Sequence, residues 1–132
     1  MAEHFGEHLT IDGYGGDPKL LNDKELILGF LRELLSTLGM HALIEPQIVL
    51  APDNGVKDPG GYSAFVIIAE SHISIHTFPR REFISADVYT CKNGLDAVLV
   101  GQLFRDKFQL KEIETNFIKR GTKYPEHNIH EN

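Results

Sequence analysis

The sequence has little that would stabilise the protein other than a hydrophobic core. It contains one cysteine, Cys91, so no disulfide can form within the chain. The lack of disulfides is consistent with a protein of the reducing cytoplasm. It has no run of about 18 apolar residues, which excludes a membrane-spanning helix. The first residues, MAEHFGEHLTIDGYGG, lack a basic segment followed by an apolar one, so no signal peptide is expected.

Positive charge is also scarce. The net formal charge is −6, and cations cluster at Arg80-Arg81 and Lys119-Arg120. This balance argues against nucleic acid or an acidic membrane surface as the main partner. The spacing of the seven histidines and the single cysteine matches no closed zinc site, so no metal is expected.

The 132 residues, 42% of them hydrophobic, are enough for a single domain with one ordinary core spanning residues 1–132. Hydrophobic periodicity predicts a helix that follows an Asn22 cap and ends before Gly39, and a second helix from an Asn93 cap to about Phe108. Alternation and β-branched residues predict strands at residues 8–12, 41–51, 62–69, 72–77, 83–90 and 113–118.

This mixed order of strands and helices predicts an α+β fold, a two-layer α/β sandwich with a mostly antiparallel sheet and helices packed on one face. The other face of the sheet would be exposed and partly apolar, which favours dimerisation or a deep pocket. Residues 52–61 form a loop that is long for a hairpin, and residues 121–132 form a polar tail.

Polar residues directly follow the most hydrophobic predicted strand. The segment AESHISIHTFP places Glu70, Ser71, His72 and His76 where the core would be expected to continue. In an ordinary protein Ser71 would be a turn residue, His72 exposed and His76 a hydrogen-bonded core histidine. A Ser-His-Asp hydrolase is disfavoured, because the sequence has no G-x-S-x-G elbow.

The combination of motifs is more specific than its parts. The run GGYSAFVIIAESHISIHTFP, followed by ADVYTC ending at Cys91, resembles the bacterial and archaeal S-adenosylmethionine decarboxylases. The segment GEHLTIDGYGGDPKLLND resembles the opening strand and turn of that family. The resemblance extends over about residues 6–108, with a family-like Arg120-Gly121 beyond it.

The resemblance implies a self-cleaving proenzyme that needs no bound organic cofactor. The Ser71 hydroxyl would attack the carbonyl of Glu70, and an N-to-O acyl shift followed by β-elimination would give a β chain, residues 1–70, and an α chain, residues 71–132. The α chain would begin with a pyruvoyl group made from Ser71. Its ketone would form a Schiff base with the substrate amine and accept electrons as CO₂ leaves.

The resemblance also implies roles for other residues. Ser63 and His76 match positions used in self-processing, and Cys91 matches the acid that protonates the substrate carbon. Phe78 stands where an aromatic residue would stack on adenine. Taken singly, Ser63 is an ordinary strand residue, Glu70 a solvated turn residue and Cys91 core filler, but together at this spacing they favour the functional interpretation.

Several positions depart from the family pattern. Arg80 replaces an acidic residue beside the site, and the loop APDNGVKDPGGYS is longer than usual, so one side of the adenine sandwich has no clear counterpart. A pyruvoyl-dependent ornithine or arginine decarboxylase is therefore an alternative to a S-adenosylmethionine decarboxylase of spermidine synthesis. Asp53, Asp58 and Glu82 are then candidate amine contacts or simple surface charges. A third alternative is an uncleaved, non-catalytic binding or regulatory subunit.

The spacing of the motif has geometric consequences. Ser71 and His76 are five residues apart, so on one unbroken strand they would face opposite ways. We therefore expect a strained turn at Glu70-Ser71, with Ser63 and Cys91 on flanking strands as neighbours of Ser71. The resemblance implies a homodimer of cleaved αβ units with active sites at the interface.

Overall fold

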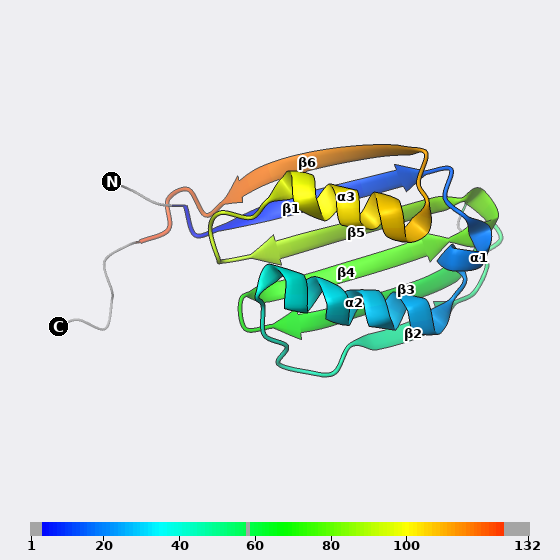
Figure 1. Ribbon diagram of the computed structural model, residues 1–132, viewed down its shortest axis with the longest axis horizontal. Helices are drawn as coiled ribbons and strands as arrows, with labels where there is room; N and C mark the ends of the chain where they lie inside the picture. The colour runs from blue at the N-terminus through cyan, green and yellow to red at the C-terminus, as the bar shows by residue number, and fades with distance from the viewer. Residues whose placement is uncertain (1–3, 58, 126–132) are drawn as a thin grey trace.

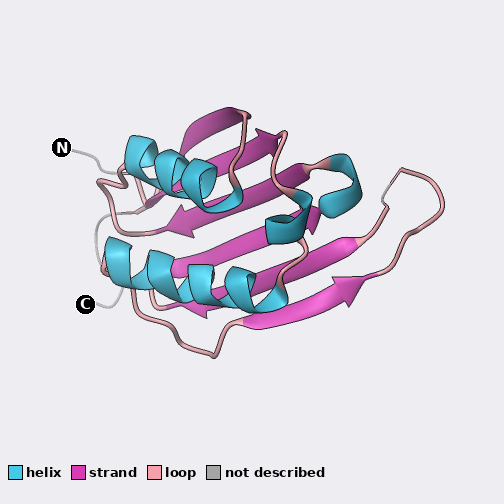
Figure 2. Ribbon diagram, turned by 45° about the vertical axis from the view of Figure 1, so that its right-hand side comes forward, coloured by secondary structure: helices cyan, strands magenta, loops and turns pink. Residues whose placement is uncertain are grey.

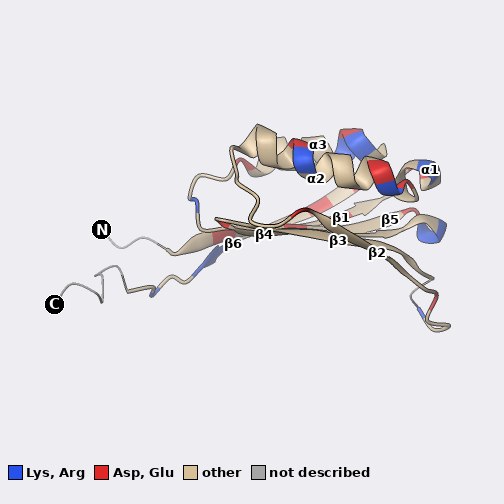
Figure 3. Ribbon diagram, turned by 90° about the horizontal axis from the view of Figure 1, so that it is seen from below, with Lys and Arg blue, Asp and Glu red and all other residues tan. Residues whose placement is uncertain are grey.

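An antiparallel sheet carries helices on one face and leaves the other face open, as the edge-on view in Figure 3 shows. The computed structural model describes residues 4–57 and 59–125, and within them the sheet has six strands in the order β2-β3-β4-β5-β1-β6. Figure 1 labels the strands, which are β1 (Gly6–Tyr14), β2 (Gln47–Ala51), β3 (Gly61–Ile68), β4 (Ser71–Phe78), β5 (Phe83–Thr90) and β6 (Glu112–Arg120). The predicted α+β sandwich is confirmed.

The helices α2 (Lys24–Leu38) and α3 (Ala97–Phe108) lie side by side across the sheet (Figure 2). Phe30 of α2 packs edge to face against Phe104 of α3, with ring centroids 4.9 Å apart. The sheet contributes alternate buried residues, such as Ile73 and Ile75 of β4. This apolar layer stabilises the fold and leaves the intervening residues of each strand on the open face.

Both predicted helix caps are wrong by a few residues. The side chain of Asp23, not Asn22, accepts a hydrogen bond from the Leu26 N–H at 3.0 Å, because Asn22 ends a short helix, α1 (Pro18–Leu21). Asp96, not Asn93, caps α3. In both cases an aspartate lies nearer the first helical turn, where a carboxylate also interacts favourably with the helix dipole. The predicted end at Gly39 is confirmed by its left-handed φ of 65°.

The predicted strand at residues 41–51 is shorter in the structure, because β2 begins at Gln47. Before it, Ala42 makes an isolated bridge to Ile68, and the chain then bends away from the sheet. Pro46 has no N–H to donate to a ladder, so the strand starts after it. The strands β1 and β6 are longer than predicted, since they pair with each other along their whole length.

Between β4 and β5 the chain makes one short 3-10 turn, η1 (Pro79–Arg81). No helix within the described ranges is long and apolar enough to cross a lipid bilayer. The loop between β2 and β3 projects beyond the sheet at the end where η1 lies (Figure 2).

Candidate active site

The turn between β3 and β4 holds Ser71 in an unusual backbone conformation. Ile68 pairs with Ser71, so Ala69 and Glu70 form the two-residue link between the strands. Ser71 has a backbone φ of 147°, a value that residues other than glycine rarely adopt. Holding a residue in such a backbone conformation lowers the free energy of unfolding by about 1–3 kcal/mol. The predicted strained turn at Glu70-Ser71 is confirmed.

The carbonyl of Glu70 accepts a hydrogen bond from the backbone N–H of Cys91 at 2.7 Å. The register explains this contact: Ser71 pairs with Thr90, and Cys91 follows it at the end of β5. A fixed N–H on a carbonyl oxygen polarises the carbonyl and stabilises negative charge that develops there. Cys91 is exposed rather than core filler, and its predicted proximity to Ser71 is confirmed.

The side chain of Glu70 is held by the segment that follows α2. Its carboxylate accepts from the backbone N–H of His41 at 3.2 Å and lies 3.2 Å from Nδ1 of the same residue. The His41 N–H lowers the pKa of Glu70 below its usual value, against a smaller opposing effect of burial. The His41 carbonyl in turn accepts from the Ala69 N–H at 2.8 Å. The residue before Ser71 is therefore fixed through both its side chain and its backbone carbonyl.

Ser63 and His76 form a second site at the other end of β4. They are directly paired across β3 and β4, and Oγ of Ser63 lies 2.9 Å from Nδ1 of His76. Five residues of strand separate His76 from Ser71, which is about 16 Å. The prediction that Ser63 neighbours Ser71 is wrong, because the register places Ser63 opposite His76. His76 is exposed on the open face and is not a core histidine.

Aromatic and charged residues lie at the same end of the sheet as this second site. The Phe78 ring lies 5.4 Å from the Phe83 ring, centroid to centroid. Beyond it, a cavity of about 320 Å³ is lined by residues of the β2–β3 loop and η1: Asp53, Gly55, Val56, Lys57, Pro59, Arg80 and Arg81.

The proposed amine contacts differ in what they touch. Asp53 faces Arg80 at 3.5 Å between Oδ2 and Nη1, so its charge already has a cationic partner. Glu82 adopts a left-handed φ of 55° at the end of η1 and is exposed. Asp58 lies outside the described residues.

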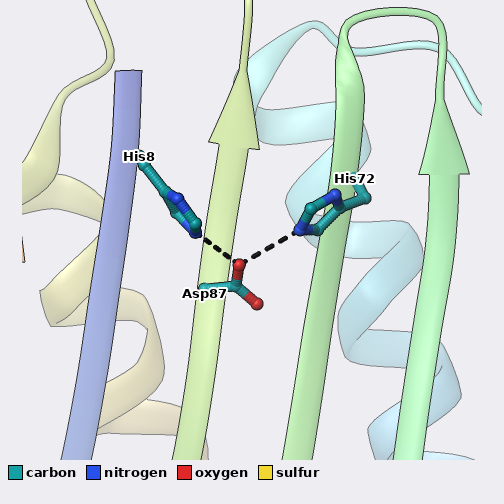
Figure 4. A group of neighbouring side chains, drawn as sticks. All are labelled: His8, His72 and Asp87. Carbon is teal, nitrogen blue, oxygen red and sulfur yellow. Dashed lines mark hydrogen bonds and ion pairs between the residues drawn. The ribbon is translucent and has the colours of Figure 1, made fainter. Parts of the chain in front are cut away.

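A polar cluster on the open face, near the turn between β3 and β4, was not predicted (Figure 4). Oδ2 of Asp87 lies 2.6 Å from Nε2 of His8 and 3.1 Å from Nε2 of His72. The Ser74 hydroxyl donates to the other carboxylate oxygen of Asp87. Strand alternation places His72 and Asp87 on the open face, but sequence spacing carries no signal that β1 and β4 flank β5.

The hydrogen bonds of His8 show which of its ring nitrogens carries a proton. Nη1 of Arg120 lies 2.8 Å from Nδ1 of His8, and because a guanidinium only donates, Nδ1 accepts and Nε2–H of His8 points to Asp87. Burial raises the pKa of Asp87, but hydrogen bonds from Ser74, His8 and His72 outweigh it and hold the pKa below its usual value.

The same cluster could bring ligand atoms to a metal ion, since one atom each of His8, His72 and Asp87 lie within 4.8 Å of one another. For Nε2 of His8 to bind a metal, its proton would have to move to Nδ1, which faces the Arg120 guanidinium. The hydrogen-bond network therefore favours a closed set of charges and donors over a metal centre.

The sequence matches the model of a protein family described as S-adenosylmethionine decarboxylase over residues 7–121. Curated relatives named S-adenosylmethionine decarboxylase proenzyme include one from Pyrobaculum islandicum, 31% identical over 112 residues, covering 85% of each chain. Another, from Pyrococcus abyssi, is 33% identical over 117 residues, covering 89% of this chain and 79% of the relative.

A solved structure supports the same relationship. The adenosylmethionine decarboxylase from Aquifex aeolicus superimposes with a TM-score of 0.79 and 27% identity, covering 96% of this chain and 99% of that chain. The motif around Ser71, the fold and the match over most of the sequence agree. The chain belongs to the S-adenosylmethionine decarboxylase family.

Proposed function

We propose that this protein is a self-cleaving, pyruvoyl-dependent carboxy-lyase that converts S-adenosylmethionine to CO₂ and decarboxylated S-adenosylmethionine. The decarboxylated product is the aminopropyl donor of spermidine synthesis. The observation that carries the proposal is the turn at Glu70-Ser71. There a serine with a φ of 147° follows a carbonyl that accepts the Cys91 N–H at 2.7 Å. Relatives named S-adenosylmethionine decarboxylase proenzyme support it.

Self-cleavage uses the chain's own atoms. The Ser71 Oγ adds to the Glu70 carbonyl carbon, the Cys91 N–H stabilises the resulting oxyanion, and the C–N bond breaks to give an ester and a free Ser71 amine. Loss of the Ser71 α-proton then expels Glu70 as a carboxylate and leaves dehydroalanine. Tautomerisation, addition of water and loss of ammonia complete the pyruvoyl group, so one water enters and one ammonia leaves.

The residues around Ser71 fit this group. Cleavage releases the left-handed strain at Ser71, while His41 keeps hold of the Glu70 side chain. The pyruvoyl ketone supplies an electrophile that captures an amine and accepts the electron pair released with CO₂. Cys91, which is exposed and adjacent, would deliver the proton to the substrate carbon.

The second site requires a partner copy of the chain. His76 is about 16 Å along β4 from Ser71, too far to transfer a proton within one chain. If two copies pack open face to open face around a two-fold axis perpendicular to the strands, the Ser63–His76 end of one copy lies over the Ser71–Cys91 end of the other. Each active site is then built from both copies.

The open face is suited to such a partner. Apolar side chains of β2 and β3 are partly exposed on it, with Val49, Phe65 and Ile67 retaining 64%, 42% and 39% of their surface. They lie opposite Ser63, Gln47 and His72 in the sheet register. Exposed apolar patches rimmed by polar groups are typical of protein interfaces. A homodimer of cleaved αβ units is therefore the proposed assembly.

Mass spectrometry of the purified protein tests self-cleavage. We expect fragments ending at Glu70 and beginning at residue 71, the second lighter than a serine-headed chain by the mass of ammonia. Ser71→Ala should remain one inactive chain, whereas the control Ser36→Ala, on the exposed side of α2, should cleave normally. A wild-type chain that stays whole would support the non-catalytic binding subunit instead.

Release of CO₂ from labelled substrates then identifies the amino acid. We expect turnover with S-adenosylmethionine. Turnover of ornithine or arginine with no reaction of S-adenosylmethionine would establish the alternative, in which Arg80 and the long β2–β3 loop have altered the substrate pocket.

A further inference from the structure

Glu7 is a buried carboxylate for which the proposed chemistry has no use. It lies in β1 with 6% of its surface exposed, among the side chains that face the helices. A charged group is rarely buried unless hydrogen bonds or opposite charges compensate for the lost water. The partners of Glu7 therefore show what this carboxylate holds in place.

These partners belong mainly to the loop that follows Cys91. Oε1 of Glu7 accepts from the backbone N–H groups of Gly94 at 3.0 Å and Leu95 at 2.9 Å. Oε2 lies 2.9 Å from Nε2 of His4. Burial raises the pKa of Glu7, but the hydrogen bonds from His4, Leu95 and Gly94 outweigh it, so the carboxylate is ionised at neutral pH.

The loop from Cys91 to Asp96 joins β5 to α3, and β1 contacts it at both ends. At its start, a Cβ on Gly6 would lie 2.5 Å from the Thr90 carbonyl oxygen and 3.1 Å from Cα of Cys91. At its end, Glu7 binds Gly94 and Leu95. The backbone of Cys91 is thus confined between the packing of Gly6 and the hydrogen bonds of Glu7.

We propose that Glu7 is a positioning residue for Cys91. The inference rests on the proposed function and adds to it a residue that acts through the loop and not on the substrate. Holding Gly94 and Leu95 sets the direction of the loop, and the loop sets where the Cys91 thiol and N–H point. A displacement of about 1 Å at a catalytic group is enough to slow a reaction about 100-fold.

The test compares Glu7→Ala and Glu7→Gln with the control Glu112→Ala, an exposed glutamate of β6. The measured quantity is the number of turnovers completed before inactivation, because protonation at the wrong carbon leaves the substrate nitrogen on the enzyme. We expect Glu7→Ala to lower this number about tenfold or more and to slow self-cleavage. Glu7→Gln keeps an oxygen acceptor for both N–H groups and should stay within about twofold of wild type.

A merely structural role would lower thermal stability without changing the ratio of turnover to inactivation. The inference is overturned if folded Glu7→Ala keeps the wild-type ratio, or if Glu7→Gln is as defective as Glu7→Ala. Should Glu7→Ala not fold, Glu7→Asp, one methylene shorter, takes its place under the same criteria. A wild-type protein that neither cleaves nor decarboxylates would refute the proposed function itself, which is a separate result.

Discussion

A mixture of two inactive chains should recover activity if each active site is built from two copies. Ser71→Ala has no nucleophile, and His76→Ala lacks the group proposed for proton transfer, whose loss should slow cleavage about 100-fold or more. In a mixed dimer, Ser71 of the His76→Ala chain would face His76 of the Ser71→Ala chain. The opposite end of that dimer would lack both groups.

The expected yield follows from the two-fold arrangement. With equal amounts of the two chains and random pairing, about half of the dimers are mixed, and each has one complete site. About half of the His76→Ala chains should therefore cleave at close to the wild-type rate. Every cleaved chain should carry the His76→Ala substitution, which its mass identifies.

Co-expression of the two chains, followed by mass spectrometry and sedimentation analysis, measures this yield. A chain carrying both substitutions, mixed with Ser71→Ala, is the control and should give no cleavage. If the His76→Ala chains cleave no faster in the mixture than alone, although dimers form, His76 does not act on Ser71 of the partner copy. The proposal that each active site is built from two copies is then refuted.

Other substitutions test the individual contacts. Cys91→Ala should still cleave but inactivate within far fewer turnovers, and a wild-type rate of decarboxylation with normal product would contradict its role as acid. Gly6→Ala should destabilise the fold by about 1–3 kcal/mol in urea unfolding, because its Cβ meets the Thr90 carbonyl. Gly29→Ala should not, because the added Cβ would meet no atom from outside its own helix within 4 Å. Asp87 has a lowered folded-state pKa, so its stabilisation is present above the ordinary value of 3.8 and is lost as the pH falls through the folded pKa. Asp87→Asn should therefore weaken the dependence of the urea midpoint on acid pH, and an unchanged dependence would count against the hydrogen-bond network.

The sequence was informative wherever the signal is local. Alternation in β3, β4 and β5 predicted those strands within two residues, and the odd spacing of Ser71 and His76 predicted a bend. Caps were less predictable, because Asn22 and Asp23, or Asn93 and Asp96, satisfy similar preferences. Only tertiary contacts decide which side chain reaches the first turn.

The arrangement of the site depended on strand register, which short motifs do not encode. Ser63 was expected beside Ser71, but the antiparallel register of β3 and β4 places it opposite His76 instead. Glu7 and the Asp87 cluster were missed for the same reason. The hydrogen bonds of His8 with Asp87 and of Glu7 with Leu95 join residues that are 79 and 88 apart in sequence, brought together by the position of β1 beside β5.

The Asp87 cluster bears on how a second copy can cover the open face. A charged group buried at an interface is costly when its hydrogen bonds come from water that must be removed. Here Asp87 is already bound by Ser74, His8 and His72, and the positive charge of Arg120 contacts His8 from the far side. These hydrogen bonds are already formed within one chain, which lowers the cost of covering Asp87 with a partner. The exposed apolar residues of β2 and β3 favour association, and the polar cluster is compatible with the proposed dimer.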